Sequence, residues 1–120
     1  MTIPTLTLYG IPNCDTVKKA RAWLAEQGRA HDFHDFKKAG VPEAELDAWL
    51  AAVGWERLVN RAGTTWRKLD EASRAATVDA ASARALMLAQ ASVIKRPVVE
   101  WPGSAVTVGF APADWQARLK

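Results

Sequence analysis

The sequence has little of several features that mark other classes of protein. It contains a single cysteine, so it can form no internal disulfide, and nothing in it indicates secretion. No apolar run approaches the roughly 18 residues that a membrane-spanning helix needs. No block of like charge is longer than two residues, which argues against a nucleic-acid-binding patch. Residues 1–5 also lack the basic and apolar regions of a signal peptide. We therefore expect a cytoplasmic protein with no membrane or nucleic-acid partner.

The remaining composition is that of a globular protein. Of the 120 residues, 49% are hydrophobic and 24% are charged, and the net charge is +3. A chain of this length buries about two thirds of its unfolded surface as one domain, so we expect a single domain over residues 1–120. Six tryptophans are many for this length, but they are scattered through separate segments. Such residues are typical of cores and interfaces.

One stretch near the N-terminus organises the chain. Residues 6–9 are β-favouring and precede a Gly/Pro turn at 10–12, which predicts a short strand followed by a turn. A helix is predicted over 15–27, with Asn13 as a candidate N-cap and Gly28 as the residue that ends it. This arrangement places the only cysteine at the mouth of a helix.

That position makes Cys14 a candidate nucleophile. The first N–H groups of a helix have no partner inside it and carry partial positive charge, so they favour a thiolate over a thiol. Lys18, one turn along, adds a cationic bias, while Asp15 opposes it. The alternative is that Cys14 packs as a small hydrophobic residue, as free cysteines often do. Its polar neighbours and its loop-to-helix position favour the reactive thiol.

The rest of the chain reads as strand, helices, hairpin and helix. The predicted elements are a strand at 30–36, a polar turn at 37–40, a helix from Pro42 to Gly54, a short helix at 55–60, a piece at 64–69 capped by Thr64 or Thr65, a helix at 80–90 capped by Asp79, a hairpin of 98–101 with 105–108, and a last helix from Pro112. The first two strands and the helix between them predict a parallel pair with a right-handed crossover. The helical middle, about 42–91, is predicted to be an insertion between two β-rich parts.

The two histidines invite a metal interpretation that their spacing does not support. His31 and His34 are three residues apart in the predicted strand, so their side chains point to opposite faces. No cysteine or third histidine accompanies them. We therefore expect no metal site.

Three segments of the chain carry a resemblance to a known family. Residues 8–21 (LYGIPNCDTVKKAR), 63–69 (GTTWRKL) and 94–98 (IKRPV) are similar to the arsenate-reductase-like family, which includes ArsC, Spx and the YffB proteins, and most of all to the YffB branch. The resemblance implies an α/β protein with a thioredoxin-like fold. Its sheet would be mixed, with about four strands, and would carry the helical insertion at about 42–91.

The resemblance also implies a set of site residues. It implies a cis bond between Arg96 and Pro97, which would turn the backbone of Arg96 toward Cys14, where an extended thiol peptide such as glutathione would pair with it. Arg96 and Arg61 match arginines that hold an oxyanion and stabilise the thiolate in arsenate reductases. An arginine suits this task because its guanidinium is always charged and offers several N–H donors in one plane. The alternative for each is a surface salt bridge. Asn13 and Lys18 are further candidates for binding the substrate or glutathione.

Departures from the family pattern narrow the expected activity. Position 17 is valine where thioredoxins and Spx have a second cysteine, so a disulfide formed by Cys14 must be released by an outside thiol. This favours a monomeric, glutathione-dependent monothiol oxidoreductase, with glutathione as co-substrate, a small oxyanion or disulfide as substrate, and no permanently bound cofactor. Residues 106–110 lack the third arginine of arsenate reductases, which argues against arsenate. Two alternatives remain: an arsenate reductase, and a Spx-like protein that binds RNA polymerase without catalysis.

Overall fold

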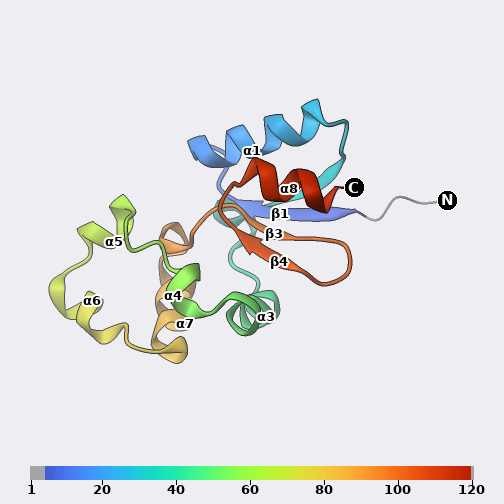
Figure 1. Cartoon of the computed structure of the whole chain (residues 1–120). Coiled ribbons are helices and arrows are strands. Elements are labelled where there is room, and N and C mark those ends of the chain that lie inside the picture. Colours follow the sequence, from blue (N-terminus) through green and yellow to red (C-terminus); the bar gives the residue numbers. More distant parts are fainter. Residues whose placement is uncertain (1–4, 120) are drawn as a thin grey trace. The chain divides into compact units, whose positions relative to one another are not determined.

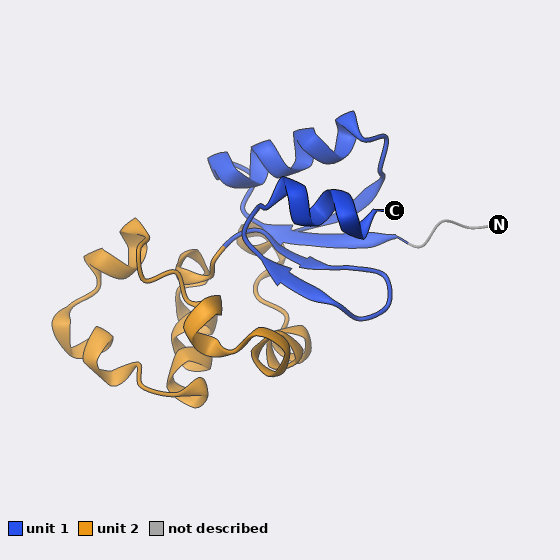
Figure 2. Ribbon diagram, viewed as in Figure 1, with its two compact units in different colours: residues 1–34, 96–120 blue, residues 35–95 orange. Residues whose placement is uncertain are grey.

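A computed structural model describes residues 5–119 and separates the chain into two compact units. One unit contains residues 1–34 and 96–120, and the other contains residues 35–95 (Figure 2). Within the described range, no helix is both long enough and apolar enough to cross a membrane. The prediction that residues 1–120 form one domain stays a prediction, and the two units are described in turn.

The first unit is built on a four-stranded mixed sheet, which confirms the predicted α/β class (Figure 1). The strand order is β2-β1-β3-β4. The strands are β1 (Leu6–Gly10), β2 (His31–Asp35), β3 (Val98–Glu100) and β4 (Val106–Val108). β3 is antiparallel to both of its neighbours, pairing Val99 with Leu8 of β1 and with Thr107 of β4. The predicted hairpin is therefore present, and its first strand lies beside β1.

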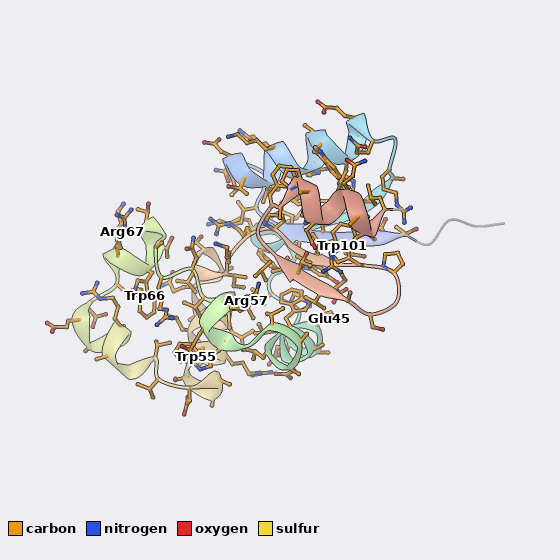
Figure 3. The ribbon with its side chains drawn as sticks, viewed as in Figure 1. Glu45, Trp55, Arg57, Trp66, Arg67 and Trp101 are labelled. Carbon is orange, nitrogen blue, oxygen red and sulfur yellow. The ribbon has the colours of Figure 1, made fainter. Side chains whose placement is uncertain are left out.

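Two helices, α1 (Asp15–Glu26) and α8 (Pro112–Arg118), cover the same face of this sheet (Figure 1). The core beneath them is apolar and nearly inaccessible to solvent. It consists of Leu6, Leu8, Val17, Ala20, Leu24, Val99, Trp101 and Trp115. Trp101 follows β3 (Figure 3), and its ring meets that of Trp115 edge-on at 5.3 Å between centroids. Trp23 of α1 meets Trp115 in the same way at 5.9 Å, so three of the scattered tryptophans converge in one core.

The C-terminal end of α1 is defined by local backbone geometry. At the C-terminal end, Gly28 has a φ of 67° and its N–H donates to the carbonyl of Ala25 at 3.0 Å. The N–H of Arg29 donates to the carbonyl of Leu24 at 2.9 Å, which completes a Schellman motif. Gly28 therefore ends the helix as the sequence predicts.

Two predicted N-caps are wrong. The N-cap of α1 is Cys14 and not Asn13, because a tight turn precedes the helix: the N–H of Cys14 donates to the carbonyl of Ile11 at 3.1 Å, and Asn13 lies within that turn. The cap of the helix at 64–68 is Gly63 and not a threonine. Gly63 takes the extended conformation of a cap, with φ −79° and ψ 160°, while Thr64 is already the first helical residue.

The second unit is helical. Its elements are α2 (Phe36–Ala39), α3 (Glu43–Val53), α4 (Trp55–Leu58), α5 (Thr64–Lys68), α6 (Glu71–Ala76), α7 (Ala80–Ala89) and the 3-10 turn η1 (Ala91–Val93). Asp79 caps α7, as predicted from the sequence, and the structure adds that it forms a capping box with Ser82. The sequence did not predict α6 or η1, and residues 37–40, predicted as a polar turn, lie largely in the single helical turn α2. Asp35 caps that turn by accepting the N–H of Lys37 at 2.8 Å.

A short backbone connection closes this helical unit. Val59 and Ile94 form an isolated antiparallel bridge, the N–H of Asn60 donates to the carbonyl of Val93 at 2.7 Å, and the N–H of Lys95 donates to the carbonyl of Leu58 at 2.8 Å. The end of α4 is thereby fixed beside the segment that follows α7.

Candidate functional site

Cys14 sits at the junction between a turn and a helix, with its sulfur at the edge of the core. The N–H of Lys18 donates to the carbonyl of Cys14 at 2.9 Å, which closes the first turn of α1. The side chain of Cys14 is partly exposed, and it packs against the apolar core beneath α1 and α8. A thiol in this position can be reached by a substrate while one side of it rests on packed residues.

The environment of Cys14 favours the thiolate. Partial burial is the largest single influence and raises the pKa of the thiol, because removing a charge from water is costly. The N–H of Val17, the guanidinium of Arg96 and the N–H of Thr16 all act in the opposite direction. Together they outweigh burial, so the pKa of Cys14 lies below its ordinary value.

The backbone contribution comes from the cap position of Cys14. Thr16 and Val17 are the second and third residues of α1, whose N–H groups face the side chain of the N-cap residue. The geometry is not that of a regular cap hydrogen bond, but both groups stabilise a negative sulfur. Sequence reasoning expected the first N–H groups of the helix to act on the thiol but did not identify these two residues, because it placed the cap at Asn13. Assigning the cap to Cys14 is the signal that would have identified them.

Arg96 brings a permanent positive charge to the same sulfur. It acts on Cys14 both by a side-chain hydrogen bond and by its charge. The bond between Arg96 and Pro97 is cis, as the resemblance implied. Pro97 is buried, and its carbonyl accepts the N–H of Gly109, just after β4, at 2.9 Å. The first unit therefore brings Arg96, the residue before the cis bond to Pro97, to Cys14 from a segment far away in the sequence.

Of the other predicted site residues, Asn13 and Lys18 belong to the sheet unit and are not among the groups that act on the sulfur. The side chains of Asn13 and Lys18 are exposed. Arg61 belongs to the helical unit, where it pairs with Glu56 at 3.8 Å and lies 5.7 Å from the ring centre of Trp55 (Figure 3 labels Trp55). This ion pair with Glu56 is the surface salt bridge that the sequence analysis gave as the alternative to a site role for Arg61. The site roles of these three residues stay predictions.

The two histidines lie in different surroundings. The Nε2 atom of His31 accepts a hydrogen bond from Nε of Arg21 at 3.3 Å, and the ring of His34 lies 5.1 Å from that of Tyr9. Burial and the charge of Arg21 lower the pKa of His31. Over residues 5–119 there is no group of three His, Cys, Asp or Glu side chains that could hold a metal ion.

Comparison with known proteins extends the likeness over nearly the whole chain. Residues 9–118 match the model of the ArsC family. An uncharacterised protein of Haemophilus influenzae is 39% identical over 114 residues, which cover 95% of this chain and 98% of that protein.

Solved structures agree with this match. A protein named YFFB is 53% identical, covers 97% of this chain and 100% of its own, and superimposes with a TM-score of 0.90, which confirms the predicted likeness to YffB. An arsenate reductase (ArsC) related protein from Brucella melitensis is 54% identical, with a TM-score of 0.76 and coverage of 100% and 98%. These matches show that the chain belongs to the ArsC family.

Proposed function

We propose that the protein is a glutathione-dependent monothiol reductase in which the Cys14 thiolate is the nucleophile. The observation that carries the proposal is the action of the Arg96 guanidinium on the Cys14 sulfur, beside the N–H groups of the first turn of α1. A thiolate, and not a thiol, is the attacking species in thiol–disulfide exchange. A group that stabilises the thiolate therefore raises the fraction of reactive enzyme at neutral pH.

The proposed reaction proceeds in two exchanges. The Cys14 thiolate attacks the glutathione sulfur of a mixed disulfide, forms a Cys14–glutathione disulfide and expels the substrate thiolate, which takes a proton from water. The thiolate of a second glutathione then attacks the glutathione sulfur of that adduct, forms oxidised glutathione and restores the Cys14 thiolate. The substrate disulfide is reduced by two electrons, and glutathione supplies them. The chain contains no second cysteine to release the adduct, which is why an outside thiol is required.

Arg96 and Pro97 support the binding of glutathione in this scheme. The guanidinium of Arg96 suits the carboxylates of glutathione as well as the Cys14 sulfur, because it offers several donors in a fixed plane. The backbone around the cis bond is proposed to pair with the extended peptide. The same guanidinium would also hold an oxyanion, so arsenate is a second candidate substrate, in line with the name of the Brucella relative. Strand β4 carries no arginine to assist, which makes arsenate the weaker candidate.

A turnover assay with a glutathionylated peptide tests the proposal. We expect the wild-type protein to release the peptide thiol in the presence of glutathione, and mass spectrometry to detect a glutathione adduct on Cys14. Cys14→Ser should abolish both signals, whereas Lys95→Gln, which changes an exposed side chain, should leave them unchanged. Full activity in Cys14→Ser would reject the mechanism. A parallel assay with arsenate reports on the second candidate through arsenate-dependent consumption of glutathione.

A further inference from the structure

The glycine at the end of β1 is not required by its backbone conformation. Five other glycines have positive φ values between 67° and 88°, a conformation that other residues rarely adopt, and these are Gly28, Gly40, Gly54, Gly103 and Gly109. Gly10 is not one of them. A reason for glycine at this position must therefore lie in the space around it.

That space is filled by one side chain. Ordinary van der Waals contacts begin at 3.4 Å. A Cβ placed on Gly10 would lie only 2.7 Å from Cγ2 of Val17, which is a clash, and 3.5 Å from its Cγ1. Val17 cannot easily yield, since it is fully buried in the core and its β-branched side chain is restricted in χ1. A methyl group at position 10 would instead push the first turn of α1 away from the end of β1.

The residue that occupies this space is also one that supports Cys14. Val17 is the third residue of α1, and its N–H is one of the groups that stabilise a negative Cys14 sulfur. The strength of an N–H interaction depends steeply on distance and angle. A displacement of Val17 by a few tenths of an ångström therefore reaches the sulfur through the backbone of the same residue.

We infer that Gly10 is a positioning residue for Cys14: the missing Cβ lets Val17 seat the first turn of α1 against β1, and this seating sets where the N–H groups of Thr16 and Val17 lie relative to the sulfur. The inference deepens the proposed function and rests on it. Gly10 does not contact the substrate in this scheme, and its effect passes through α1.

The pH dependence of alkylation measures this effect. We expect Gly10→Ala to move the midpoint of the rate of Cys14 alkylation by iodoacetamide to higher pH, with a several-fold slower rate at a fixed pH below the midpoint. An unchanged midpoint in a folded Gly10→Ala protein would overturn the inference.

A second substitution separates positioning from general damage. Val17→Ala removes both Cγ atoms, and the Cβ that remains is 3.7 Å from the Cβ placed at position 10, an ordinary contact. Val17→Ala alone is the reference for the lost side chain, and we expect Gly10→Ala/Val17→Ala to share its midpoint because the clash is absent from both proteins. If Gly10→Ala fails to fold, recovery of a folded protein in the double variant shows that the clash with Val17 is the cause. A midpoint higher in the double variant than in Val17→Ala would contradict the inference.

Gly28→Ala is the matched control, because it strains the other end of the same helix, where a Cβ meets no atom within 4 Å. Gly28→Ala should lower the melting temperature and leave the alkylation midpoint unchanged. If its midpoint rises as much as that of Gly10→Ala, the shift in Gly10→Ala is due to loss of stability and the positioning role is rejected. Alkylation requires neither glutathione nor turnover. Failure of the reductase assay and failure of the Gly10 inference are therefore distinguishable.

Discussion

The reactive state of Cys14 depends on a balance between groups that act on a single sulfur. Partial burial opposes ionisation, and two backbone N–H groups and one guanidinium favour it. The backbone groups are fixed by the formation of α1, whereas the guanidinium belongs to a side chain far away in the sequence. The contribution of Arg96 can therefore be removed without altering the helix.

We predict that Arg96→Gln raises the pKa of Cys14. The substitution removes the positive charge and the charge-assisted hydrogen bond, both of which favour the thiolate. The alkylation rate at a fixed pH below the midpoint should fall several-fold, and turnover should fall with it. Lys95→Gln makes the same change of charge on the neighbouring exposed residue and should leave the midpoint in place. Equal effects of the two substitutions would show that only net charge matters and that the contact of Arg96 does not.

The lowered pKa of Cys14 also predicts how stability changes with pH. A thiol whose pKa is lower in the folded state than in the unfolded chain stabilises the folded protein. This stabilisation is fully present at pH values above the pKa of the thiol in the unfolded chain, about 8.5. That stability is lost as the pH falls through the folded pKa. Serine does not ionise in this range, so the excess stability of wild type over Cys14→Ser should grow as the pH rises through this window. Urea unfolding of both proteins at several pH values measures the difference, and a constant difference would contradict the predicted shift.

Local signals predict those elements that are defined by their own residues. α1 is predictable because Val17, Ala20 and Leu24 recur at helical spacing and form one buried face, and because Gly28 adopts the backbone conformation that ends the helix. Its cap was mispredicted because asparagine is a far more common N-cap than cysteine. The error had a consequence for function, since the cap residue proved to be the proposed nucleophile itself.

Sequence reasoning missed α6 because its residues give no hydrophobic pattern. α6 contains no buried residue, so it shows no apolar stripe. It is supported by polar contacts: the side chain of Asp70 accepts the N–H of Ser73 at 3.2 Å, and Arg74 donates to the carbonyl of Leu69 at 2.6 Å. Contacts of this kind depend on the geometry of both partners and leave no periodic pattern in the sequence.

At the scale of the whole molecule, the sequence pattern alone could not order the strands. β1 lies between β2 and β3, and β3 comes from the far end of the chain. Periodicity describes only neighbours along the chain, so the strand order was not predicted, and the meeting of Arg96 with Cys14 was expected only from the family resemblance. The convergence of Trp23, Trp101 and Trp115 in one core was likewise not visible in their scattered positions.

The two compact units raise the question of how cooperatively the chain unfolds. Leu24 of the sheet unit and Leu58 of the helical unit are both fully buried, so Leu→Ala at each removes the same atoms from a packed site. Each substitution should cost about 2–5 kcal/mol. If residues 1–120 form one cooperative domain, as we predict, either substitution lowers the protection of the slowest-exchanging amides of β1 and of α7 by the same free energy, because those amides exchange only through global unfolding.

Hydrogen exchange resolved by residue measures both units in one experiment. Val78→Ala serves as the control, since Val78 is 67% exposed and its truncation should change the protection of neither unit. The opposite result is equally clear: if Leu24→Ala lowers protection only in β1 and Leu58→Ala only in α7, each unit unfolds by itself. The helical segment would then be a separately folding unit, and Cys14, Arg96 and Pro97, which all lie in the sheet unit, would keep their arrangement while the helical unit opens.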